Sequence, residues 1–118
     1  MTTTLKTQRI LQLAVFTAGV TIGGAVSASA QDVKKGEQVY NAQKCQTCHS
    51  IAGKGKKTNP LDGVGAKLSA DEIKQWIVDP KGMTAKAKST KKPPMPAKYD
   101  KLPPADIDAL VAYMASLK

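Results

Sequence analysis

The segment Cys45-Gln46-Thr47-Cys48-His49 constrains this chain more than any other feature, because it holds both cysteines and the single histidine of the sequence. A disulfide between thiols three residues apart would close a very small loop and restrain little of the unfolded chain. A thioredoxin-like redox pair needs strands around it, and the sequence shows no convincing strand pattern. A structural zinc site needs four ligands, which the remaining residues do not supply as Cys or His.

One further interpretation uses the histidine as well as both thiols. Cys-x-x-Cys-His is the attachment sequence of c-type haem. One helical turn between Cys45 and Cys48 matches the separation of the two vinyl groups, each of which forms a thioether with one thiol. His49 then lies beneath the iron as a proximal imidazole. We therefore predict one covalent haem c, attached to Cys45 and Cys48, with His49 as an axial ligand of its iron.

The first thirty residues have the three-part layout of a secretory signal peptide. A polar start with Lys6 and Arg9 precedes an apolar run over residues 10–26, and small residues follow up to Ala30. An uncleaved membrane anchor is the alternative, but the run contains three glycines and is shorter than the roughly 20 residues of a bilayer span. We expect cleavage after Ala30, a mature domain over residues 31–118, a periplasmic location, and no stable membrane span after cleavage.

Charge and aromatic content narrow the choice of partners. The chain has 18 Lys and Arg against 9 Asp and Glu, a formal net charge of +9. A basic exported protein can meet nucleic acid, a membrane surface or an acidic protein. Nucleic acid is disfavoured by export and by the few aromatic residues available for stacking. A domain this small also tends to need a cofactor or crosslink to complete its core.

Three segments of the mature domain have helical patterns. Asp32 is a candidate cap for a helix over about residues 33–43. Ser69 and Glu72 form a capping box for a helix that reaches Asp79 and stops at Pro80. Pro104 suits the first turn of a last helix. The apolar faces comprise Val33, Gly36, Val39 and Tyr40; Ile73, Trp76 and Ile77; and Ile107, Leu110, Val111, Met114 and Leu117.

Two stretches lack a hydrophobic period. Residues 53–65 and 80–104 are rich in Lys, Gly and Pro and are predicted as loops. A loop as long as the second is usually functional in a compact domain. The sequence thus predicts a single all-α domain with about three main helices and long loops.

These features resemble a class I monohaem cytochrome c over most of the mature chain. The resemblance is carried by Gly36, Tyr40, Cys45, Cys48, His49, Pro60, Pro80, Met95 and Tyr113. It implies a small cytochrome c fold wrapped around one haem, with the first helix crossing the last at Gly36. Two departures stand out: Asn59-Pro60 replaces a frequent Gly-Pro, and the stretch from Pro80 to Met95 is longer and richer in lysine.

The resemblance also implies partners for the haem. The carbonyl of Pro60 would accept the Nδ1 proton of His49, although an ordinary loop proline is the alternative. Apart from the resemblance, Trp76, on the apolar face of its helix, and Tyr99, four residues after Met95, are candidates to pack near the haem. Core packing and loop anchoring are their simpler roles. The Trp76 indole could donate a hydrogen bond to a propionate or near Met95.

The sixth iron ligand is predicted to be Met95. Met1 belongs to the signal and Met114 to the last helix, which leaves Met83 and Met95. Prolines 93, 94 and 96 limit the backbone freedom around Met95, and its spacing from Tyr113 fits the family. Met83 and an open or water-bound position are the alternatives.

A His/Met pair suits electron transfer better than catalysis, because a filled sixth position blocks access to the iron. The two groups of lysines near the proposed ligands would dock an acidic redox partner. These are Lys54, Lys56 and Lys57, and Lys86, Lys88, Lys91, Lys92 and Lys98. We expect a monomeric, non-enzymatic shuttle. A subunit permanently bound to an oxidoreductase complex is the alternative, and a haem enzyme or gas sensor is a third class.

Overall fold

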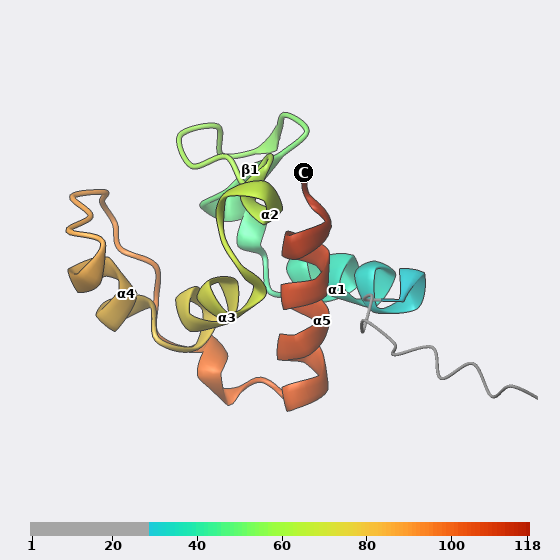
Figure 1. Cartoon of the computed structure of the whole chain (residues 1–118). Coiled ribbons are helices and arrows are strands. Elements are labelled where there is room, and N and C mark those ends of the chain that lie inside the picture. Colours follow the sequence, from blue (N-terminus) through green and yellow to red (C-terminus); the bar gives the residue numbers. More distant parts are fainter. Residues whose placement is uncertain (1–28) are drawn as a thin grey trace, which may run out of the picture.

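The computed structural model describes residues 29–118, so the predicted signal segment up to residue 28 lies outside it. The described part is mostly helical and has one small sheet (Figure 1). Its α-helices are α1 (Ala30–Ala42), α2 (Val64–Lys67), α3 (Ala70–Val78), α4 (Pro80–Lys86) and α5 (Pro104–Ser116). Two 3₁₀ turns are η1 (Cys45–Thr47) and η2 (Tyr99–Lys101), and the strands are β1 (Ser50–Ile51) and β2 (Lys54–Gly55). The all-α prediction is therefore confirmed.

Helices α1 and α5 cross at close range and form the main packing contact of the domain (Figure 1). Gly36 lies at the crossing, where a Cβ would overlap the Ala109 carbonyl oxygen and the Cβ of Tyr113. One turn later the Tyr40 ring meets Tyr113 edge to face, with centroids 5.8 Å apart. The crossing implied by the resemblance is present, and it is possible because Gly36 has no side chain.

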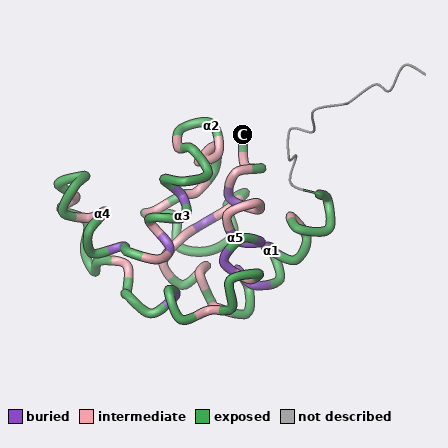
Figure 2. The backbone as a smooth tube through the Cα atoms, turned by 60° about the horizontal axis from the view of Figure 1, so that its bottom comes forward, coloured by how far each residue is buried: buried purple, intermediate pink, exposed green. Residues whose placement is uncertain are grey.

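Helix α3 completes the core against α5. Its capping box is present: the Ser69 hydroxyl accepts from the Glu72 backbone N–H at 3.2 Å, and the Ser69 N–H donates to the Glu72 carboxylate at 2.9 Å. Figure 2 shows most of the buried backbone along α1, α3 and α5. The buried cluster consists of Val39, Tyr40, Ile73, Ile77, Tyr99, Ile107, Leu110 and Met114.

The start of the first helix was predicted wrongly. Ser29 is the N-cap of α1, and Asp32 occupies the third helical position, where its carboxylate accepts from the Ser29 N–H at 3.2 Å and hydroxyl at 2.8 Å. Ser29 completes a reciprocal capping box that Asp32 alone cannot make. The predicted boundary after Ala30 therefore falls inside the first turn of α1.

The predicted loops contain more structure than expected. Asp79 caps α4 by accepting from the Gly82 N–H at 3.0 Å, and Pro80 begins this helix as well as ending α3. Residues 53–65 contribute β2 and α2, and β1 pairs antiparallel with β2 through Ser50 and Gly55. These elements are too short to show a hydrophobic period. Within residues 29–118 no helix is long and apolar enough to traverse a bilayer.

Candidate functional site

The Cys-x-x-Cys-His segment forms a tight turn directly after α1. Lys44 takes a left-handed conformation with φ of 55°, which turns the chain out of the helix. The backbone N–H groups of Cys48 and His49 both donate to the Cys45 carbonyl, at 3.1 and 3.0 Å. The thiols of Cys45 and Cys48 are half-buried and are not joined to each other. The turn thus presents two thiols and an imidazole within five residues.

The β1–β2 hairpin packs back onto this turn and holds it. The Lys56 N–H donates to the carbonyls of both Gln46, at 3.1 Å, and His49, at 3.0 Å. Gly55 has φ of 107°, and a Cβ there would overlap the same two carbonyls. The residues around Gly55 in the sequence do not indicate this close packing. The one sequence feature that indicates it is a glycine shortly after a functional motif.

The His49 ring is oriented by a backbone carbonyl, which belongs to Asn59 and not to Pro60. The Nδ1–H donates to the Asn59 oxygen at 3.1 Å, since a carbonyl can only accept. Ser50 and Pro60 form a parallel bridge in which the Ser50 N–H donates to Asn59 and the Leu61 N–H donates to Ser50. In such a pairing the residues on either side of Pro60 supply the hydrogen bonds to Ser50. The carbonyl of Pro60 itself therefore points away from Ser50. The acceptor predicted from the resemblance was wrong by one residue.

Burial sets the protonation of the groups in the turn. It lowers the pKa of His49 below its ordinary value; the Asn59 hydrogen bond opposes this shift, and the Lys91 charge adds to it. The imidazole is therefore neutral at neutral pH, and with its proton on Nδ1 the Nε2 lone pair is free to bind a metal. Burial also raises the pKa of the Cys45 thiol to about 11, so that this thiol is protonated at neutral pH.

A single cleft collects the side chains that the sequence singled out. Its volume is about 320 Å³, which is in the range of cavities that hold small molecules. The predicted residues that line it are Cys45, Cys48, His49, Pro60, Trp76, Met95 and Tyr99. Met83, the alternative to Met95, is half-buried on α4 and does not line the cleft. Trp76 lies there beside Ile73 and Ile77 of the same helix.

Several lining residues were not foreseen. Tyr40 reaches the cleft from α1, and its buried hydroxyl has no hydrogen-bond partner among the described residues. Burial, followed by the neighbouring Cys45, raises the pKa of Tyr40 to about 12. Asn59, Thr84 and Ser89 add polar groups from segments predicted as loops, where no sequence period marks them, and Lys91, predicted only as a docking lysine, also lines the cleft. An apolar cleft with few polar groups and an unsatisfied hydroxyl fits a bound cofactor.

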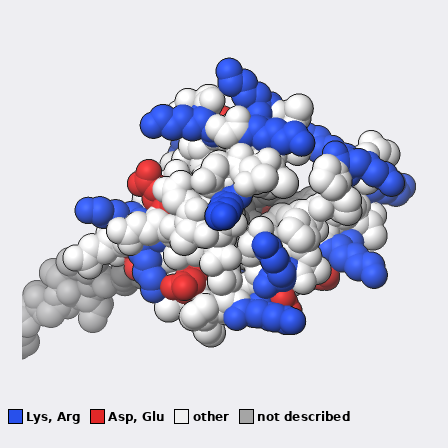
Figure 3. Space-filling view, turned by 180° about the vertical axis from the view of Figure 1, so that it is seen from behind, with Lys and Arg blue, Asp and Glu red and all other residues white. Residues whose placement is uncertain are grey.

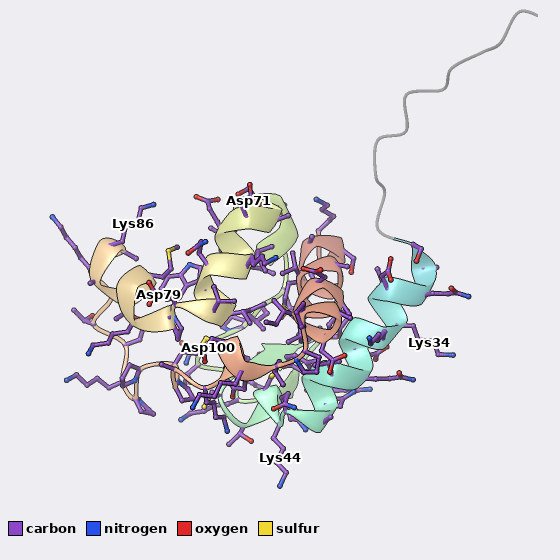
Figure 4. All side chains as sticks on the ribbon, turned by 90° about the horizontal axis from the view of Figure 1, so that it is seen from below. Lys34, Lys44, Asp71, Asp79, Lys86 and Asp100 are labelled. Carbon is purple, nitrogen blue, oxygen red and sulfur yellow. The ribbon has the colours of Figure 1, made fainter. Side chains whose placement is uncertain are left out.

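Basic side chains are spread over much of the molecular surface. Figure 3 shows them along the top, at the sides and at the lower edge of one face, with fewer acidic side chains at the left and in the lower part. Lys44 and Lys91 line the cleft itself. Figure 4 shows Lys44 and Lys86 extending outward, from the motif side and from α4 respectively. Among residues 29–118, no three His, Cys, Asp or Glu side chains gather to hold a metal ion.

This fold and cleft define a small all-α protein of the c-type haem class. The family model for cytochrome c matches residues 33–118, and the chain belongs to this family. Searches of curated proteins and of solved structures found no match. Membership implies a covalently bound haem c with its iron and a function in electron transfer. Proteins of the family are generally electron carriers and not enzymes.

Proposed function

We propose that this protein is a periplasmic electron carrier in which His49 and Met95 are the axial ligands of one haem c and Cys45 and Cys48 are its thioether residues. The observation that carries the proposal is the single cleft, which gathers these four side chains from two segments far apart in the sequence. The Met95 segment lies between α4 and η2, whereas the other three residues follow α1.

The residues around the cleft suit this role chemically. The Asn59 carbonyl holds the neutral imidazole of His49 by its Nδ1 proton, which leaves Nε2 to face a metal. Prolines on both sides of Met95 restrict its backbone, so a weak thioether ligand is ordered at low entropic cost. Ile73 and Leu110 exclude water from the cleft wall. A haem held here supplies an iron that takes up and releases one electron.

Three other residues are proposed as haem surroundings. Tyr99 is buried in η2, and Lys98 places its Nζ 5.3 Å from the ring centroid. Trp76 is half-buried on α3, and Pro60 is exposed at the edge of the cleft. All three line the cleft, so each would add contact area to the edge or face of a flat cofactor.

The proposal is tested on the protein exported by its host. We expect its intact mass to include one haem and to show where the signal is removed. Voltammetry should give a reversible one-electron wave, and the reduced protein should bind carbon monoxide only poorly, because the sixth position is filled. Ready binding of carbon monoxide would favour an enzyme or gas sensor instead. Gel filtration of native extracts separates a free monomer from a subunit of a larger complex.

Lysines beside the cleft are proposed to dock an acidic redox partner. Charge steering of this kind raises the association rate by about tenfold or more at low salt and weakens as salt rises. We therefore expect the second-order electron-transfer rate to fall with ionic strength. Lys86→Glu, on α4, should lower that rate severalfold, whereas Lys34→Glu, the same charge change on α1, should have little effect. A rate independent of salt would contradict the docking proposal.

A further inference from the structure

One residue connects the loop behind His49 with the segment that carries Met95. The backbone carbonyl of Asn59 accepts from His49 Nδ1 at 3.1 Å, while its side-chain Oδ1 accepts from Lys91 Nζ at 2.8 Å. The same Nζ donates to the Thr58 carbonyl at 3.4 Å. Lys91 precedes Met95 by four residues, in the stretch between α4 and η2. The two sides of the cleft are thus joined through Asn59.

We propose that Lys91 and Asn59 form a clamp that ties the Met95 segment to the loop orienting His49. In this clamp Lys91 is a positioning residue for both axial side chains, and it forms a hydrogen bond with neither of them. The inference rests on the proposed function, because the clamp serves ligand geometry only where His49 and Met95 bind the same iron. Loss of Lys91 would loosen the attachment of Met95 and disturb the orientation of His49.

The Met95 segment has few other means of attachment. Residues 90–98 contain no helix or strand, and prolines 93, 94 and 96 have no N–H to donate. Within the described chain, the hydrogen bonds that join residues 90–98 to the loop over 50–61 all come from Lys91 Nζ. Packing adds the half-buried side chain of Met95 against the core. A hydrogen bond from a cation to an amide oxygen is therefore the main polar restraint on this segment.

The restraint is of moderate strength. Lys91 is exposed, so water competes for its ammonium group and screens its charge. Its loss should therefore increase opening of the segment by about three- to tenfold without unfolding the domain. The core of α1, α3 and α5 does not contain Lys91, which keeps the global stability separate from this local effect.

The test compares oxidised holoprotein of the wild type with Lys91→Ala, Asn59→Ala and Lys91→Arg. Two rates are measured: binding of added imidazole, which competes for the position of Met95, and amide hydrogen exchange over residues 88–98. Both rates should rise about three- to tenfold in Lys91→Ala and Asn59→Ala, and the double variant should rise no further. Lys91→Arg should restore most of the slow rates. Lys34→Ala, which removes an exposed lysine on α1 away from this segment, is the matched control and should match the wild type.

Unchanged exchange and imidazole binding in Lys91→Ala would overturn the clamp. A shift in reduction potential with no change in either rate would also overturn it, because Lys91 would then act only as a nearby charge. Failure of the proposed function can be distinguished from failure of the clamp. If the wild type lacks sulfur ligation, imidazole binds it without competition, and exchange over residues 88–98 still decides whether Lys91 holds this segment.

Discussion

Gly36→Ala is expected to destabilise the folded protein by about 3 kcal/mol or more, because a methyl group has no room at the crossing of α1 and α5. Helix propensity alone predicts the opposite sign, a gain of about 1 kcal/mol when glycine in a helix becomes alanine. The overlap with backbone of Ala109 cannot be relieved by a side-chain rotation, so the helices would have to separate. The steric cost of the methyl group should therefore exceed the gain in helix propensity.

Urea or thermal unfolding of the holoprotein measures this effect. The midpoint of thermal unfolding should fall by roughly 10 °C or more in a domain of this size. Gln38→Ala, an exposed position on the same helix, is the control and should stay within about 0.5 kcal/mol of the wild type. A Gly36→Ala protein as stable as the wild type would show that α1 and α5 do not meet as closely as described.

Local sequence signals predicted much of this fold because they act over a few residues. The capping box of Ser69 and Glu72 and the first-turn Pro104 place two helix starts without any tertiary information. The Cys-x-x-Cys-His spacing identified the turn after α1 for the same reason. The contact between Gly36 and Tyr113 could not be predicted from local signals, because it joins two helices that are far apart in the sequence. The resemblance to a family supplied that pairing.

The remaining features depend on how segments pack and not on their own composition. α4 is a short helix whose start is stabilised by Asp79, and its apolar residues are too few to form a period. The acceptor for His49 depends on whether Asn59 or Pro60 faces the ring, which the parallel bridge to Ser50 decides. Lys91 looks like any solvated lysine until the fold brings it to Asn59. Such contacts are set by tertiary geometry.

Met95→Ala is expected to have the largest effect on the chemistry of the site. Removing the thioether would leave the sixth position open or water-bound, and it would lower the reduction potential by on the order of 0.1 V or more, since a soft sulfur ligand favours ferrous iron. Carbon monoxide should then bind the reduced protein readily. Met83→Ala is the matched control, because Met83 belongs to the neighbouring helix α4 but does not line the cleft.

The absorption spectrum of the oxidised protein in the red region tests the ligand assignment most directly, because sulfur bound to ferric haem iron gives a charge-transfer band there. We expect this band in the wild type and in Met83→Ala and expect none in Met95→Ala, with the haem still covalently attached in all three. A band that persists in Met95→Ala, or that disappears in Met83→Ala, would contradict the assignment of Met95.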